Sequence, residues 1–189
     1  MLTIALQNTY DRRRLHTAHL RAIARAAPVA YSCDFHLALV DFPLEGKPAD
    51  IAERVSESTT IGGGRRYLLE LARTGRFHLL SGERGFPPQF GTVVVTTSKP
   101  WEGRTVKPIE IAERALEGES FIMLIGLGRH GLPKETFKSA RLHMDVTERG
   151  VSLETCTAIG MIPCKIRTLM EALKWETGRR TSHGSSLPC

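Results

Sequence analysis

The stretch FIMLIGLGRHGLPKE, residues 121–135, decides the fold because it joins an apolar strand to a glycine-rich loop. A run of bulky apolar residues closed by a glycine is typical of a strand buried on both faces of a parallel sheet. The loop from Gly126 to Gly131 matches G-x-G-x-x-G, and such glycines let a ligand approach the backbone closely. The sequence therefore predicts an α/β fold with a ligand-binding loop after this strand.

Apolar strands alternate with helical segments on both sides of that stretch. The alternation predicts a mostly parallel sheet flanked by helices. We expect a single domain over residues 1–175 and a polar, flexible tail over 176–189. The expected strands are residues 3–7, 35–42, 76–81, 91–98, 121–125 and 141–146. The expected helices are residues 11–27, 51–55, 65–73, 108–116 and 163–175, with a break at the glycines 62–64.

The composition narrows the class of protein. No segment approaches the roughly 20 apolar residues that span a bilayer, and the first residues lack the layout of a signal peptide. We therefore expect a cytoplasmic protein without a membrane partner. The four cysteines form no C-x-x-C pair, and the seven histidines form no H-E-x-x-H motif, so we expect no metal. A formal charge of +6 favours a polyanionic partner such as RNA or DNA.

The glycine motif by itself leaves a dinucleotide-binding oxidoreductase open. Asp145 follows at the distance where a ribose-binding acid lies in an NAD site. However, the motif falls in the last third of the chain, with one more strand after it. Residues 132–140 are also short for a crossover helix. A purely structural glycine turn is the third alternative.

Residues 147–163, TERGVSLETCTAIGMIP, form an unusually long segment of small and apolar residues after the last strand. Long loops inside compact domains tend to be functional, and small side chains allow close contact with a flat ligand. The alternative is a helix that begins early, near Ser152, with Cys156 and Ile159 in the core. After this segment, apolar residues recur at helical spacing and form a stripe on one face of the expected helix. Either the sheet or another subunit must cover this stripe, which consists of Ile166, Leu169, Met170 and Leu173.

These segments together resemble the SPOUT methyltransferases, whose C-terminal half is tied in a deep trefoil knot. In that superfamily, loops after three successive strands hold the methyl donor. The first is similar to TTSKP after GTVVV, the second to GLGRHGLP, and the third to SLETCTAIGMIP. The match covers residues 92–173, and TIALQNTYDRRRLHTAHLRAIARA at the start resembles the opening strand and arginine-bearing helix of the 2′-O branch.

The resemblance implies S-adenosylmethionine as the cofactor and RNA, either tRNA or rRNA, as the substrate. The sequence departs from the family where an asparagine of the first helix, the glutamate of the second loop and an asparagine of the third loop are expected. We therefore expect an archaeal-type branch, and a knotted RNA-binding protein without catalysis is the main alternative. The implied donor-binding residues are Thr96, Thr97, Gly126, Leu127, Gly128, Gly131, Leu132, Ser152, Leu153, Cys156, Thr157 and Ala158.

An arginine-rich helix supplies the candidate chemistry. Its spacing predicts Arg14, Arg21 and Arg25 on one face, where they are either a solvated charged face or an RNA contact. By position in the resemblance, Arg21 or Arg25 stabilises the oxyanion that develops on a ribose 2′-hydroxyl, with Arg21 preferred.

For a base nitrogen, a carboxylate serves better as proton acceptor. Glu148 is our first candidate for that role, with Glu154 and Asp145 as alternatives. We also expect a homodimer packed through the last helix and the arginine helix. The predicted RNA-contacting residues are Arg12, Arg13, Arg14, Arg65 and Arg66.

Overall fold

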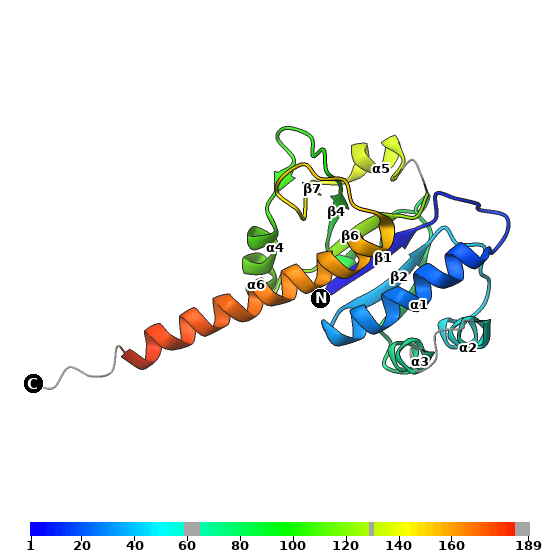
Figure 1. Cartoon of the computed structure of the whole chain (residues 1–189), viewed down its shortest axis with the longest axis horizontal. Helices are drawn as coiled ribbons and strands as arrows, with labels where there is room; N and C mark the ends of the chain where they lie inside the picture. The colour runs from blue at the N-terminus through cyan, green and yellow to red at the C-terminus, as the bar shows by residue number, and fades with distance from the viewer. Residues whose placement is uncertain (59–64, 129–130, 184–189) are drawn as a thin grey trace, which may run out of the picture.

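The computed structural model describes residues 1–58, 65–128 and 131–183. Within these ranges, seven parallel strands form one sheet in the order β3-β2-β1-β6-β4-β7-β5, flanked by helices (Figure 1). The predicted mostly parallel α/β architecture is therefore confirmed. The strands are β1 Leu2–Gln7, β2 His36–Val40, β3 Phe77–Leu80, β4 Thr92–Thr96, β5 Thr105–Val106, β6 Phe121–Gly126 and β7 Leu142–Met144. The helices are α1 Thr17–Ser32, α2 Pro48–Ser58, α3 Arg65–Arg73, α4 Pro108–Leu116, α5 Lys134–Ser139 and α6 Thr155–His183, with a 3-10 turn at Pro88–Phe90.

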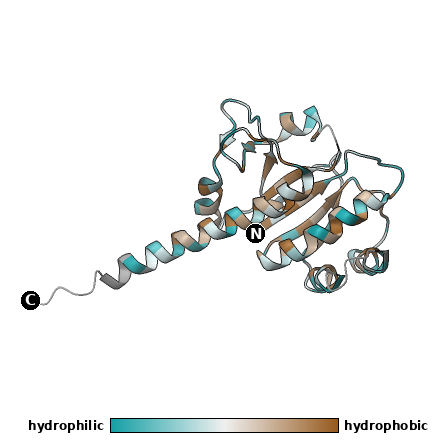
Figure 2. Ribbon diagram, in the orientation of Figure 1, coloured by the Kyte–Doolittle hydropathy of each residue, from teal (hydrophilic) through white to brown (hydrophobic). Residues whose placement is uncertain are grey.

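The central strands are buried on both faces, as their continuous apolar runs predict. Ile4 and Leu6 of β1 face the larger core, which α1, α2, α3, α4 and α6 cover. Ala5, between them, faces a smaller core that includes Phe90 and Leu132. Figure 2 shows the strands as predominantly hydrophobic and the helices as mixed along their length. Alternate residues of one strand therefore serve two separate cores.

The first helix differs from its prediction at both ends. It begins at Thr17 rather than Asp11, because the Asp11 carboxylate accepts the backbone N–H groups of Arg13 and Arg14 and holds a turn there. It also continues through Pro28 to Ser32. Buried alanines on its inner face pack against the sheet, and this packing offsets the backbone hydrogen bond that proline removes. Arg14 therefore lies outside the helix, so the predicted face is wrong for Arg14, whereas Arg21 and Arg25 share one exposed face of α1.

The last helix begins earlier and ends later than residues 163–175. Its first residue is Thr155, and the Glu154 side chain accepts the N–H of Cys156 at this end (2.8 Å). Pro163 is accommodated inside the helix, where Ile159, Ile162 and Ile166 are buried in the larger core. The alternative of an early helix start is thus closer to the structure. The helix also includes residues 176–183 of the expected tail, while residues 184–189 lie outside the described residues.

The parallel arrangement places the ends of β4, β6 and β7 at one edge of the sheet. The segments that follow these strands therefore meet there, as the three predicted loops require. Helices α3 and α4 coincide with the ranges predicted for them, whereas the short edge strand β5 was not predicted. The predicted break at residues 62–64 lies outside the described residues. In the described part of the chain, no helix combines the length and apolar character needed to cross a bilayer.

Candidate functional site

A cleft lies at the carboxyl ends of β4, β6 and β7, and we call it the sheet-edge cleft. Its cavity volume is about 220 Å³, and the cleft opens to solvent. Most of the predicted donor-binding residues line it, so the structure brings the three predicted loops together. They are Thr96, Thr97, Gly126, Gly131, Leu132, Ser152, Leu153 and Ala158.

The three glycines of the second loop have different physical roles. A Cβ on Gly126 would lie 2.6 Å from the carbonyl carbon of Gly131, so the loop closes on itself only with glycine here. Gly131 has a positive φ of 68°, a conformation that favours glycine. A Cβ on Gly128 would lie 2.6 Å from Thr9 Oγ1, and the Gly128 N–H donates to that oxygen (2.7 Å). Gly128 therefore joins this loop to the segment after β1.

Asp145 organises the third loop. Its Oδ1 accepts hydrogen bonds from the backbone N–H and the hydroxyl of Thr147 (2.9 and 2.7 Å), and its Oδ2 accepts the N–H of Gly150 (2.7 Å). Burial acts to raise the pKa of Asp145, but these hydrogen bonds outweigh it and hold the pKa below its ordinary value. Because both carboxylate oxygens accept hydrogen bonds from the loop itself, the role of ribose acceptor in an NAD site is disfavoured.

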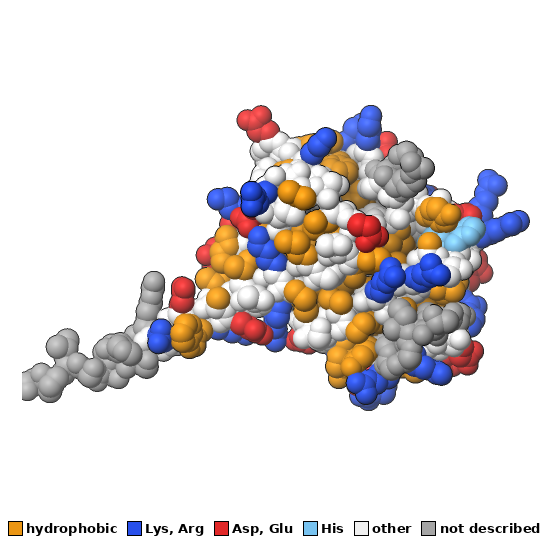
Figure 3. Space-filling view, in the orientation of Figure 1, with side chains coloured by type: hydrophobic (Ala, Val, Ile, Leu, Met, Phe, Trp, Pro, Cys, Tyr) orange, Lys and Arg blue, Asp and Glu red, His pale blue; other side chains and the backbone are white. Residues whose placement is uncertain are grey.

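A second cleft, which we call the arginine cleft, lies between α1, the segment before it and the start of α6. Arg21 and Arg25 are one helical turn apart on α1, and both line this cleft. The Arg25 guanidinium donates to Cys156 Sγ (2.7 Å). Figure 3 shows Lys and Arg side chains over α1 and over the segment that precedes it. The remaining lining residues are Tyr10, Ala18, His19, Ala22, Leu127, Glu154, Thr155 and Cys156.

The two clefts share a wall. Thr155, the first residue of α6, lines both of them, and its hydroxyl donates to the carbonyl of Gly126 (3.3 Å). Gly126 lines the sheet-edge cleft, while the next residue, Leu127, lines the arginine cleft. The two clefts therefore adjoin at the end of β6 and the first residue of α6.

Several predicted site residues lie elsewhere. Glu148 lines neither cleft, and its carboxylate accepts a hydrogen bond from Lys165, which also donates to the Val146 carbonyl. Gly128 and Thr157 likewise line neither cleft. Among the predicted donor-binding residues, Leu127 and Cys156 line the arginine cleft instead.

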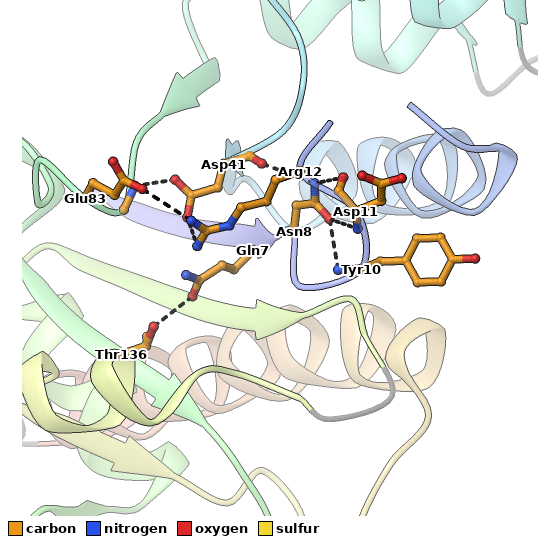
Figure 4. Close-up of polar contacts among 9 residues, drawn as sticks. Gln7, Asn8, Tyr10, Asp11, Arg12, Asp41, Glu83 and Thr136 are labelled. Carbon is orange, nitrogen blue, oxygen red and sulfur yellow. Dashed lines mark hydrogen bonds and ion pairs between the residues drawn. The ribbon is translucent and has the colours of Figure 1, made fainter. Parts of the chain in front are cut away.

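The predicted RNA-contacting arginines are divided between two places. Arg12 forms ion pairs with Asp41 (3.2 Å) and Glu83 (3.4 Å), so its guanidinium is turned toward β2 and β3 (Figure 4). Arg13 and Arg14 are exposed on the segment before α1. Arg65 and Arg66 are exposed at the start of α3 and line neither cleft. In the glycine loop, residues 129 and 130 lie outside the described residues.

A polar network that the sequence reasoning missed holds the segment before α1. The Asn8 side chain donates to the carbonyls of Asp11 (2.6 Å) and Asp41 (3.2 Å), and its Oδ1 accepts the N–H groups of Tyr10 and Asp11 (Figure 4). His19 Nδ1 accepts the N–H of His16, which leaves its Nε2 proton to donate to Asn8 Oδ1 (2.9 Å). The signal available in the sequence was the Asn8-x-x-Asp11 spacing after a strand, which is typical of a side-chain-stabilised turn.

His19 is fully enclosed in this network. Burial, and secondly the neighbouring His16 ring, lower the pKa of His19 below its ordinary value, while Asp11 acts in the opposite direction. His19 is therefore neutral at neutral pH, as its acceptor role at Nδ1 requires. For metals, the described ranges contain no group of three or more His, Cys, Asp or Glu side chains arranged to hold an ion.

Comparison with known proteins gives a family and a fold. The family model described as "Protein of unknown function (DUF531)" matches residues 2–167, and the chain therefore belongs to this family. "Uncharacterized protein MJ0224" of Methanocaldococcus jannaschii is 47% identical over 165 residues, which are 87% of this chain and 92% of that relative.

Three solved structures have a similar fold at low sequence identity. A probable methylase family protein from Haemophilus influenzae has a TM-score of 0.59 at 16% identity, over 92% of this chain and 67% of its own. A structure described as "Structural insights into the 2-OH methylation of C/U34 on tRNA" has a TM-score of 0.52 at 14% identity, over 90% and 97%. The TrmH/SpoU tRNA modifying enzyme of A. aeolicus has a TM-score of 0.52 at 14% identity, over 92% and 77%. These neighbours include SpoU/TrmH-type RNA methyltransferases, so the chain has a mostly parallel α/β fold like theirs, whereas the knot and the archaeal-type branch stay predictions.

Proposed function

We propose that this member of the family transfers a methyl group from S-adenosylmethionine to RNA. The observation that carries the proposal is the shared wall: a cleft suited to the methyl donor and a cleft lined by two arginines meet at Thr155. Methyl transfer requires the donor and the acceptor atom to be held close together in line, and two clefts that meet at one residue bring their ligands near each other. The SpoU/TrmH-type fold and the basic charge of the chain support the same reading.

The sheet-edge cleft fits S-adenosylmethionine by the chemistry of its lining. Small residues such as Gly126, Gly131 and Ala158 let the backbone approach a flat adenine ring, and the hydroxyls of Thr96 and Thr97 suit the polar groups of the molecule. When bound, S-adenosylmethionine supplies a methyl group on a sulfonium that a nucleophile can attack. Leu132 and Leu153 add apolar surface to the cleft and exclude water from the bound molecule.

We further propose the ribose 2′-hydroxyl as the acceptor. A 2′-hydroxyl loses its proton with difficulty, so a fixed cation beside it lowers the free energy of the developing oxyanion. Arg21 and Arg25 line the arginine cleft on successive turns of α1, and Arg21 makes no ion pair within the described residues. The solved structure connected with 2-OH methylation of tRNA has the same fold.

A base nitrogen is the second candidate acceptor, and Glu154 favours it. Its carboxylate lines the arginine cleft, where it would take a proton from the nucleophile. Glu154 replaces Glu148 as the carboxylate best placed for this role. However, one of its oxygens also accepts the N–H of Cys156 at the start of α6, which ties the carboxylate to the helix end.

The proposal includes the knot and the homodimer. The superfamily fold and the return of the chain from β7 to the end of β6, where Thr155 contacts Gly126, support a knotted C-terminal half. For the dimer, the stripe on α6 is covered within the chain at Ile166 and Met170. Beyond it, the helix extends away from the sheet (Figure 1), and Trp175 is 63% exposed. Light scattering on the full-length chain tests the homodimer. We expect twice the chain mass of 21.0 kDa, and the mass of one chain would contradict the dimer.

The experiment is transfer of radiolabelled methyl from S-adenosylmethionine to total RNA, followed by digestion to nucleosides. We expect label in 2′-O-methylated nucleosides. Label in base-methylated nucleosides would favour the second candidate and Glu154 as proton acceptor. RNA binding without any transfer, although the donor binds, would contradict the enzyme and leave a knotted RNA-binding protein.

A further inference from the structure

We infer that the arginine cleft takes an unpaired nucleotide, whose base stacks on Tyr10 while Arg21 and Arg25 face its sugar and phosphate. This inference rests on the proposed function and names the class of RNA site that the cleft accepts. It also assigns Tyr10 as a residue that determines specificity for an unstacked base.

Tyr10 is the large aromatic side chain at this cleft, and it is 59% exposed. Its ring extends away from Asn8 and the residues bonded to it (Figure 4). An exposed tyrosine ring offers a stacking platform that every base can use, because every base has a π-face.

The ring of Tyr10 is held in place from behind. The rings of His16 and His19 meet it edge-on, with centroids 5.3 and 5.7 Å away. Its backbone N–H donates to Asn8 Oδ1, the atom that also accepts the His19 proton. Buried polar groups therefore fix an exposed ring before any ligand arrives, which reduces the entropy lost on binding.

The arginines beside Tyr10 supply the charge that a nucleotide needs. Within the described residues, the side chains of Arg13, Arg14, Arg21 and Arg25 form no ion pair with a carboxylate. By contrast, Arg12 in the same segment is paired with Asp41 and Glu83. The guanidinium groups left without an acidic partner lie on the segment before α1 and on its exposed face, where a phosphate backbone would pair with them.

A base inside a duplex is stacked on both faces, so it cannot use Tyr10 without leaving the helix. Sequence-specific RNA proteins solve this problem by acting on unpaired nucleotides whose bases stack on aromatic side chains. The hydrogen bond from Gly128 to Thr9 connects the glycine loop of the sheet-edge cleft to the residue before Tyr10. This contact fixes Tyr10, and a base stacked on it, relative to the sheet-edge cleft.

The test compares binding of two probes by fluorescence anisotropy. One is a fluorescein-labelled oligouridylate of about ten nucleotides, within the usual site sizes for single strands. The other is the same strand annealed to its adenylate complement. We expect the wild-type chain to prefer the single strand, and Tyr10→Ala to weaken single-strand binding about ten- to hundredfold. Tyr10→Phe keeps the stacking face and should remain within about twofold of wild type.

Tyr31→Ala is the matched control, because Tyr31 is an exposed tyrosine at the other end of the same helix and lines neither cleft. A second readout is photocrosslinking with an oligouridylate that carries 5-iodouridine, which marks the side chain stacked on the base. We expect the crosslink at Tyr10. Equal binding of single strand and duplex, unchanged binding by Tyr10→Ala, or a crosslink confined to other residues would each overturn the inference.

Titration of S-adenosylmethionine into wild type and Tyr10→Ala separates this inference from the proposed function. If both bind the donor equally and only RNA binding falls, both proposals are supported. Unchanged RNA binding with intact donor binding overturns the role of Tyr10 alone. Absence of donor binding in the wild type, with RNA binding still dependent on Tyr10, overturns the methyltransferase and supports the nucleotide site.

Discussion

The sheet-edge cleft and the arginine cleft share Thr155 but are built by different means. The sheet-edge cleft forms where parallel strands end together, and small residues and glycines of three loops line it. The arginine cleft forms between a helix and the irregular segment before it, which a network around Asn8 and His19 holds in place. Backbone geometry thus shapes the first cleft, whereas side-chain hydrogen bonds shape the second.

This difference predicts that donor binding and action on RNA can be lost independently of each other. Steric changes in the glycine loop should remove donor binding, because the space there depends on missing side chains. Changes of charge or protonation on the α1 side should impair action on RNA and leave donor binding intact.

The largest effect is expected for Gly126→Val. A Cβ at this position would lie 2.6 and 2.8 Å from the backbone of Gly131 and Leu132, so the loop cannot close. We expect donor binding to be lost in calorimetric titration and the free energy of unfolding to fall by about 3 kcal/mol. Gly160→Ala in α6 is the control, since a Cβ there meets nothing within 4 Å and should not destabilise the helix. Full donor affinity in a folded Gly126→Val protein would contradict the role of this loop.

Arg21→Ala should give the next largest effect, and on the other cleft. Removing a cation beside a developing oxyanion lowers the rate about 10²- to 10³-fold. We expect this loss in methyl transfer to RNA, with the donor dissociation constant unchanged. Arg73→Ala is the control, because Arg73 is exposed on α3, pairs with Glu70 and lines neither cleft. A matching loss of donor affinity in Arg21→Ala would remove the proposed separation.

Acid should lower the stability of the folded chain, partly through His19, which lines the arginine cleft. Its pKa is lowered in the folded chain by burial, so the unfolded chain takes up the proton first as the pH falls below about 6.5. Stability therefore decreases as the pH falls from neutrality. His36, whose pKa is lowered to about 4 mainly by burial and then by His78, adds to the same loss. Urea unfolding between pH 7 and 5 measures the trend, and a stability that rises toward pH 5 would contradict it.

The smallest effect is expected for Thr155→Val at the shared wall. Valine keeps the shape but removes the hydroxyl that donates to Gly126, a contact of 3.3 Å. The loss of one such hydrogen bond lowers stability by about 1 kcal/mol, and we expect a fall in transfer rate smaller than that of Arg21→Ala. Steady-state kinetics with RNA measures it. A rate loss as large as that of Arg21→Ala would contradict a role of Thr155 limited to its hydrogen bond with Gly126.

The sheet and the sheet-edge cleft could be predicted from the sequence because local patterns determine them. Apolar runs give the strands, and parallel pairing brings the loops after β4, β6 and β7 to one edge. The resemblance to the SPOUT methyltransferases implied which residues of these loops bind the donor, and eight of them line that cleft. Gly128 was assigned to the donor for its motif, but its N–H bonds Thr9, a contact between segments far apart in the chain.

The arginine cleft was predicted less completely because it depends on contacts that have no local pattern. Arg21 and Arg25 were identified from their spacing and from the resemblance of the first helix, whereas Tyr10 and His19 were not, since Asn8 connects them across a turn. The helix boundaries failed for the same reason. Pro28 and Pro163 normally end helices, but packing of buried neighbours keeps both inside α1 and α6.

The most direct test of the account is calorimetric titration of S-adenosylmethionine into the wild-type chain and Ser152→Trp. Ser152 is an exposed residue that lines the sheet-edge cleft, so a tryptophan there should fill it without disturbing the core. Ser139→Trp, exposed at the end of α5 and outside both clefts, is the control. We predict micromolar binding by the wild type and the control, and no binding by Ser152→Trp. No binding by the wild type, or equal binding by all three proteins, would contradict the assignment of this cleft to the methyl donor.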